Sequence, residues 1–225
     1  MIHPYTELRF INDTIGFGVV ATALIPRGTI TWTRDPLDRA ISPEEVLALG
    51  PLFRAEIDKF TFIDGAGARV LCWDIAKYVN HSCEPTCLAP GFDFEIAVRD
   101  IAPGEQLCDD YGTLNLLEPF GCACGWAECR RIIRPDDRLR LADAWDDLVR
   151  AVFPTIGRVD QPLWPLVARR TEVEAAVLDA TRVPSCRAHF PMAAAAPPPV
   201  RAESASNGAR ATSRRVSRRP GSSPA

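Results

Sequence analysis

The chain has 225 residues, a hydrophobic fraction of 47% and a net charge of −3, which suit one globular domain with appendages. It contains no run of 18 apolar residues and no secretory signal at its start, so the sequence predicts neither a membrane partner nor export. Its eight cysteines therefore favour reduced thiols, as metal ligands or small buried groups, over disulfides. We expect an intracellular protein, cytoplasmic if it is bacterial.

Charge is spread unevenly along the chain. Residues 184–225 hold seven arginines and one acid, a charge of +6, which leaves −9 on residues 1–183. An acidic body suits a basic ligand or protein substrate. The Ala, Pro, Ser and Arg composition of residues 184–225 predicts a disordered tail. Its arginine cluster offers an electrostatic contact to nucleic acid, although a solvated tail is the simpler interpretation.

The first elements in chain order are short strands. Residues 19–25 are apolar and partly β-branched, and residues 29–33 alternate between polar and apolar side chains after a turn. Before them, Gly16 and Gly18 are interpreted as a plain turn. The alternative is that these two glycines let the backbone approach a ligand closely.

A short helix and a hairpin are expected next. Ser42-Pro43-Glu44-Glu45 is a capping box with proline at the first helical position, and the helix should end at Gly50-Pro51. Residues 60–64 and 69–73 flank a glycine-rich turn, as in a β-hairpin. Asp74 is expected to cap one helical turn that leads into Asn80-His81.

The second half of the chain changes from strands to helices. Residues 92–98 alternate as in a half-buried strand, and residues 106–108 start another short strand. A helix begins near Arg134, and a second is expected within residues 172–182. The apolar face of the first helix should comprise Leu141, Trp145, Leu148, Val149 and Val152.

Three thiols lie within eight residues at Cys122, Cys124 and Cys129. Zinc prefers four tetrahedral ligands and takes thiolate readily, so this spacing predicts a structural zinc site with a fourth ligand from elsewhere. Cys83, which follows Asn80-His81, is the best choice, and Cys87 is the alternative. The other cysteines, Cys72, Cys108 and Cys186 together with Cys87, are expected to be small buried groups.

Four motifs follow one another along the chain. They are Gly-x-Gly-Val, Asn-His-Ser-Cys-x-Pro, Gly-Glu-x-Leu-x-x-Asp-Tyr and Cys-x-Cys-x4-Cys, beginning at Gly16, Asn80, Gly104 and Cys122. In this order they resemble the SET-domain protein lysine methyltransferases with a post-SET zinc segment. The resemblance implies a fold that is mainly β with short helices, a β-clip with knot-like C-terminal threading, to which C-terminal helices are added.

On this basis we divide the chain into a SET domain, a post-SET zinc segment, a C-terminal helical extension and the disordered tail, at residues 1–118, 119–134, 135–183 and 184–225. The resemblance implies S-adenosylmethionine-dependent methyl transfer to the side-chain amine of a lysine in a histone or other basic protein. Tyr111 would stand at the methyl-transfer point, and Tyr78 would line the cofactor site or the lysine channel.

The resemblance also implies two sets of binding residues. The cofactor would be held by Phe17, Gly18, Asn80, His81 and Tyr111, with Phe120 or Trp126 over its adenine. The zinc ion (Zn2+) would be held by Cys83, Cys122, Cys124 and Cys129. The lysine amine must reach the site neutral, and an apolar channel beside a sulfonium lowers its pKa through desolvation and like charge.

This chain departs from the family pattern at two positions. Thr86 stands where the family has asparagine, and Asp109 stands where many members carry Phe or Tyr, at a position that helps to set how many methyl groups are added. No cysteine-rich segment precedes the domain, and residues 34–60 read as a variable insert. Two other functions therefore stay open: a binding module that holds cofactor and zinc without turnover, and a zinc-stabilised nucleic-acid-binding protein using the tail.

Overall fold

The structure is a computed structural model, and it describes residues 1–191. Most of the predicted tail therefore lies outside the described residues. Its first part does not: residues 186–189 form a 3-10 turn, Cys186–His189, and the Cys186 side chain is buried. The start of the tail that we predicted from composition, at residue 184, is therefore too early, because residues 186–189 pack into the fold.

The chain begins with an antiparallel pair, β1 (Thr6–Asn12) and β2 (Gly16–Ala21). Gly16 to Gly18 belong to strand β2, so the interpretation as a plain turn was wrong. The strand expected over 19–25 ends at Ala21, and Ile25 forms an isolated bridge with Ile101. Gly16 has a positive φ of 79° where the chain enters β2, which a residue with a side chain rarely adopts.

The insert expected over residues 34–60 holds one strand and two helices. Strand β4 (Arg39–Ile41) pairs with the hairpin strand β6 (Arg69–Leu71), whose other neighbour is β5 (Thr61–Ile63). Helix α1 (Pro43–Ala48) begins with the predicted capping box. Helix α1 ends before Gly50-Pro51, as predicted, but Pro51 also opens a second helix, α2 (Pro51–Phe60), because proline suits the first helical position.

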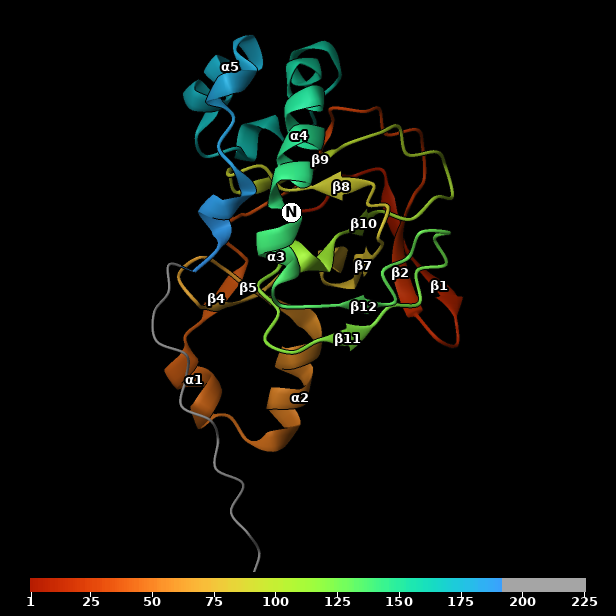
Figure 1. The fold of residues 1–225 in the computed structure, drawn as a ribbon, viewed down its shortest axis with the longest axis vertical. Coiled ribbons are helices and arrows are strands. Elements are labelled where there is room, and N and C mark those ends of the chain that lie inside the picture. Colours follow the sequence, from red (N-terminus) through yellow and green to blue (C-terminus); the bar gives the residue numbers. More distant parts are fainter. Residues whose placement is uncertain (192–225) are drawn as a thin grey trace, which may run out of the picture. The chain divides into compact units, whose positions relative to one another are not determined.

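The central sheet has the order β3-β9-β8, formed by β3 (Ile30–Thr33), β9 (Phe94–Ala97) and β8 (Cys87–Leu88). Strand β9 was predicted to be half-buried, but hydrophobic clusters lie on both of its faces. Phe94 and Ile96 pack with the C-terminal helices, and Ala97 belongs to a second cluster with Val19 and Leu107. In Figure 1, helix α4 lies above β8 and β9, and α1 and α2 lie at the opposite end.

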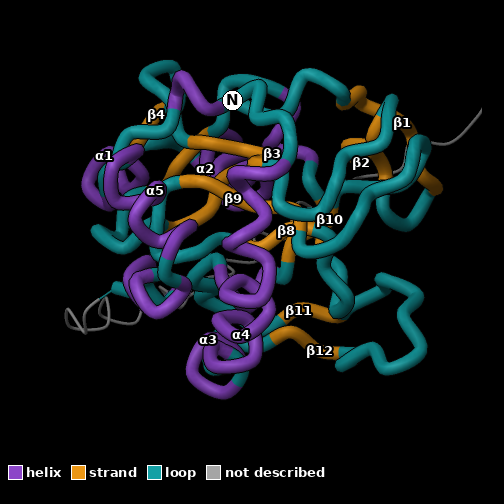
Figure 2. Tube along the Cα trace, turned by 90° about the horizontal axis from the view of Figure 1, so that it is seen from above, coloured by secondary structure: helices purple, strands orange, loops and turns teal. Residues whose placement is uncertain are grey.

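Two short pairs complete the β structure. Strand β7 (Asn80–His81) pairs in parallel with β10 (Cys108–Asp109), and β11 (Phe120–Gly121) pairs with β12 (Ile132–Ile133). A 3-10 turn, Ile75–Tyr78, leads into β7 and is capped by Asp74, as predicted. Figure 2 shows the β11–β12 pair beside α3, away from β1 and β2.

The helical extension comprises α3 (Asp137–Arg140), α4 (Ala142–Val152) and α5 (Arg170–Leu178), joined by 3-10 turns at Phe153–Arg158 and Trp164–Leu166 and followed by one at Ala180–Arg182. Trp145, Val149 and Val152 face the core as predicted. Leu148 was wrongly placed on this face, since it is 47% exposed. None of the described helices is long and apolar enough to span a bilayer.

Candidate functional site

The loop after β7 is fixed to β10 by backbone and side-chain hydrogen bonds. The backbone N–H of Ser82 donates to the Asp109 carbonyl over 2.9 Å, and the Cys108 N–H donates to Thr86 Oγ1 over 2.7 Å. Thr86 is buried. The substitution of threonine for asparagine therefore keeps a hydrogen bond between this loop and β10.

Asn80 joins β7 to the glycine-bearing strand β2. Its Nδ2 donates to the Phe17 carbonyl over 3.1 Å and to Gln106 Oε1 over 3.0 Å. A Cβ on Gly18 would lie 2.6 Å from Asn80 Nδ2 and 2.6 Å from Gln106 Oε1. The position must therefore be glycine for β2 to approach β7 this closely. Gln106 gave no signal in the sequence, yet it completes this contact.

Gly18→Ala is expected to lower the free energy of unfolding by about 1–3 kcal/mol, because the added methyl overlaps Asn80 Nδ2 and Gln106 Oε1. Denaturant unfolding measures the change. Gly121→Ala is the matched control, since its Cβ would meet open space. Equal stability of the two variants would contradict the close approach of β2 and β7.

Both ring nitrogens of His81 face other groups of the protein. The backbone N–H of Tyr111 donates to Nδ1 over 3.1 Å, so Nδ1 is an acceptor and the proton is on Nε2, which lies 3.4 Å from Cys83 Sγ. Burial lowers the pKa of His81, opposed by the Asp110 carboxylate. A contact from His81 to a cofactor would therefore come from its backbone.

Tyr111 is held between the Asn80-His81 loop and β11. Its hydroxyl donates to the Val79 carbonyl over 2.6 Å, and its ring lies 5.5 Å from that of His81 and 5.9 Å from that of Phe120. Burial raises the pKa of Tyr111, and the Asp109 charge adds to this effect. The hydroxyl therefore stays protonated and orients as a donor.

A cavity of about 280 Å³ lies beside Tyr111. Aromatic and apolar side chains form most of its wall, among them Trp32, Phe60, Phe62, Val79 and Phe120. Of the predicted site residues, Tyr111 and Phe120 line it. Phe17, Gly18, Asn80 and His81 lie outside this wall, and so does Tyr78, whose ring packs 5.3 Å from Phe60 and 6.4 Å from Phe17.

The four cysteines predicted to bind zinc come together. The Sγ atoms of Cys83, Cys122, Cys124 and Cys129 all lie within 4.8 Å of one another. Four thiols around a tetrahedral zinc with Zn–S bonds of about 2.3 Å would be about 3.8 Å apart. Cys83 Sγ lies 3.9 Å from Cys122 Sγ and 4.0 Å from Cys129 Sγ, so the set fits this ion.

Backbone groups support the same cluster. The N–H groups of Cys124, Arg130 and Arg131 donate to cluster sulfurs over 3.4, 3.5 and 3.3 Å. Such bonds suit thiolates, because charged acceptors strengthen a hydrogen bond. The alternative ligand Cys87 is buried in the core and does not belong to the cluster, and Cys72, Cys108 and Cys186 are buried as expected.

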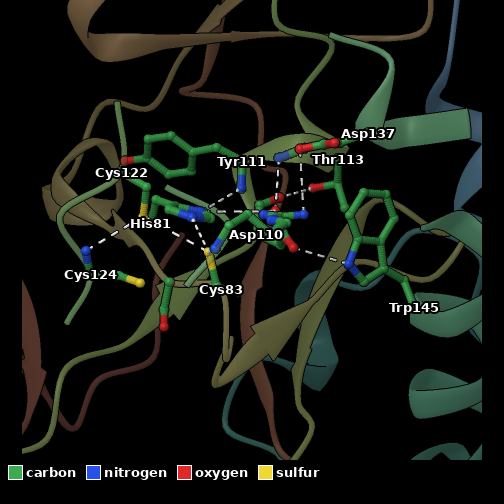
Figure 3. A network of polar contacts seen from close by, with 12 residues as sticks. His81, Cys83, Asp110, Tyr111, Thr113, Cys122, Cys124, Asp137 and Trp145 are labelled. Carbon is green, nitrogen blue, oxygen red and sulfur yellow. Dashed lines mark hydrogen bonds and ion pairs between the residues drawn. The ribbon is translucent and has the colours of Figure 1, made fainter. Parts of the chain in front are cut away.

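A buried polar network next to this cluster was not foreseen (Figure 3). Asp110 Oδ1 lies 2.6 Å from an Arg130 guanidinium nitrogen, and Asp110 Oδ2 accepts from Trp145 Nε1 over 3.1 Å. Arg130 also pairs with Asp137 over 3.5 Å. The three segments that meet here, at residues 110, 130 and 145, belong to the three predicted ordered domains, so the network fastens them together.

Residues 16–112 match the family model of the SET domain. The protein therefore carries a SET domain, in the part of the chain that holds the Asn80-His81 loop and Tyr111.

The curated relatives are histone-lysine N-methyltransferases. ATX2 of Arabidopsis thaliana is 36% identical over 66 residues, which cover 26% of this chain and 6% of the relative. An H3 lysine-4 specific enzyme of Schizosaccharomyces pombe is 32% identical over 89 residues, covering 36% of this chain and 9% of the relative. The matches thus span less than a tenth of these larger proteins.

Two solved structures show a weaker likeness. The crystal structure of KRYPTONITE in complex with mCHG DNA and SAH has a TM-score of 0.40 at 20% identity and covers 54% of this chain and 27% of that one. The methyltransferase domain of human Histone-lysine N-methyltransferase SETMAR has a TM-score of 0.42 at 18% identity, with coverage of 59% and 58%.

Proposed function

We propose that this protein transfers a methyl group from S-adenosylmethionine to the side-chain amine of a lysine in another protein. The observation that carries the proposal is the position of Tyr111. It lies in a SET domain, with its hydroxyl fixed on the Val79 carbonyl and its ring on the wall of an aromatic cavity. The histone-lysine methyltransferase relatives support the same reaction.

The chain's own residues would divide the work between two sides of Tyr111. On one side, Phe17, Gly18 and Asn80 form the compact corner proposed to hold the cofactor, which supplies a methyl group on a cationic sulfonium when bound. On the other side, the aromatic cavity would receive the lysine side chain. The aromatic and apolar part of its wall favours the neutral amine over the ammonium ion through desolvation.

Positioning is the main contribution we assign to these groups. The Tyr111 hydroxyl and the Val79 carbonyl form a rigid polar pair beside the cavity, where they can orient the amine and contact a polarised methyl through weak C–H···O interactions. His81 orients the backbone of Tyr111 rather than acting as a base. Tyr78 would contribute through its packing on Phe17 and Phe60 at the border of the two sides.

We infer that Cys83, Cys122, Cys124 and Cys129 hold a structural zinc ion, which has no free coordination position and takes no part in the methyl transfer. The ligands must be reduced, which favours an intracellular compartment. We further propose a basic protein substrate, because residues 1–183 carry a charge of −9. A contact of the arginine-rich residues 192–225 with nucleic acid concerns the part of the chain that the structure does not describe.

Tyr111→Phe is expected to reduce methyl transfer by roughly 100-fold, because the ring stays in place while the hydroxyl that orients the amine is lost. The assay uses S-adenosylmethionine with a labelled methyl group and purified core histones as a lysine-rich acceptor. Tyr5→Phe is the control, since Tyr5 is 49% exposed and lies outside the cavity.

Equal rates for Tyr111→Phe and the unaltered protein would contradict the assigned role. Calorimetric binding of S-adenosylmethionine without any transfer to protein would instead favour the cofactor-holding module that does not turn over.

A further inference from the structure

Three carboxyl groups, those of Asp58, Glu95 and Asp109, line the cavity together with Tyr111, and Asp58 is paired with Arg69. Glu95 comes from β9 and Asp109 from β10, on strands that are not neighbours in any sheet. The sequence pattern placed Glu95 on a solvent-facing side of its strand, and Asp109 replaces the aromatic residue of the family pattern. The structure instead brings both acids to the wall of one cavity.

The cavity wall also contains polar atoms that lack protein partners. Asp109 is only 7% exposed, and its Oδ1 has no hydrogen-bond partner among the described residues. Among the described residues, the indole nitrogen of Trp32 also lacks a hydrogen-bond partner. Trp32 is the residue opposite Glu95 in the antiparallel pairing of β3 with β9. Unpaired buried groups are costly, so this part of the wall favours a polar neighbour over an apolar one.

Burial and mutual repulsion keep a proton on this acid pair. Burial raises the pKa of Glu95 to about 7, and burial and the Glu95 charge raise that of Asp109 well above its usual range. The pair therefore carries at most one negative charge near neutral pH, and it offers both an acceptor and a donor. Such a pair can satisfy the N–H groups and the lone pair of an amine alike.

The wall around the acids suits an amine head group, whereas Lys59, Arg69 and Lys77, which also line the cavity, oppose a permanent cation. Trp32, Phe60, Phe62 and Phe120 present aromatic rings to the same cavity. Aromatic faces attract ammonium groups, methylated or not. A carboxyl group adds a preference that the rings lack, because it needs an N–H donor and gains nothing from an N-methyl group.

We propose that Glu95 and Asp109 form the amine-recognising end of the cavity and select a side chain whose nitrogen still carries N–H groups. This proposal rests on the proposed function for its biological meaning. The substrate class is then unmethylated lysine. Transfer stops after the first methyl groups, because each added methyl replaces a hydrogen bond between the amine and the acids. The expected discrimination is about 10- to 100-fold per hydrogen bond lost to a charged group.

The test measures binding directly, without the cofactor. n-Butylamine hydrochloride and n-butyltrimethylammonium chloride are titrated into the full chain, and the indole N–H signals of ¹⁵N-tryptophan protein are followed by NMR, with Trp32 assigned from Trp32→Phe. We expect n-butylamine to shift the Trp32 signal at a concentration at least tenfold lower than its trimethylated analogue.

The variant Asp109→Asn with Glu95→Gln keeps the shape of both side chains and should erase this preference, while Asp109→Asn alone should reduce it. Glu174→Gln, on the exposed surface of α5, is the control that removes one negative charge outside the cavity. Circular dichroism checks that each variant is folded.

Failure of this proposal and failure of the proposed function give different results. The proposal is overturned if the unaltered protein binds neither amine at a concentration that saturates a millimolar site, or binds both equally. It is also overturned if the double variant keeps the preference. The function fails instead if amine selection is seen and no methyl transfer to protein occurs. If both hold, mass spectrometry of the product should show monomethyl-lysine, with more dimethyl-lysine in the double variant.

Discussion

Removal of the metal is expected to release residues 121–132 from the rest of the protein. No residue in this stretch is buried, so few apolar contacts hold it, and the sulfur cluster and the Arg130 ion pairs are its main attachments. Structural zinc in small peptides contributes on the order of 10 kcal/mol of apparent binding free energy, which here is free energy of local folding. Cys124→Ser should therefore abolish metal binding and leave the central sheet folded.

Hydrogen exchange of residues 121–132 checks this expectation, with zinc content measured on the same samples. The unaltered protein should contain one zinc per chain, and a chelator should raise exchange in this stretch as Cys124→Ser does. Cys72→Ala is the control, because Cys72 is buried outside the cluster and its loss should leave the zinc content unchanged. Protection of residues 121–132 in metal-free protein would overturn the assignment.

Asp110→Ala is expected to lower the free energy of unfolding by about 3–5 kcal/mol. The change leaves the half-buried Arg130 guanidinium without its closest carboxylate and the buried Trp145 indole nitrogen without its acceptor. For a chain of this size such a loss corresponds to a fall in Tm of roughly 10 °C.

The Tm of Asp110→Ala, measured by thermal unfolding, is compared with that of a variant that removes an exposed Arg–carboxylate ion pair. Glu172→Ala removes the exposed Arg169–Glu172 ion pair and should lower Tm far less, because exposed ion pairs contribute little to stability. Adding Arg130→Met to Asp110→Ala should recover part of the stability, because it removes the uncompensated charge. A fall no larger than that of Glu172→Ala would show that the network does not join the segments.

Much of the architecture could be predicted because local chemistry determines it. The capping box at Ser42, the turn capped by Asp74 and the hairpin at residues 60–73 depend on neighbours in the sequence, and each is present. Helix α2 was missed because Gly50-Pro51 reads equally as the end of one helix and the start of the next. The knot-like threading of the C-terminal segment stays a prediction.

The site was predictable only where motif spacing carries information. The spacing of the thiols from Cys122 to Cys129 indicates a metal site. Cys83 could be predicted as the fourth ligand because its motif precedes theirs in the order typical of the family. Glu95 could not be found, because an acid in an alternating strand looks the same whether it faces solvent or a cavity. Asp110 and Trp145 are 35 residues apart, and no local pattern signals their hydrogen bond.

The last described turn determines where the chain can be shortened. Cys186 donates its backbone N–H to Asp146, and the His189 carbonyl accepts from Asn115 Nδ2, so this turn joins α4 to the segment after Tyr111. Ending the protein at residue 183 would expose the face of α4 that Cys186 covers. Ending it after Pro191 would keep every described contact and still remove most of the arginines that follow the helical extension.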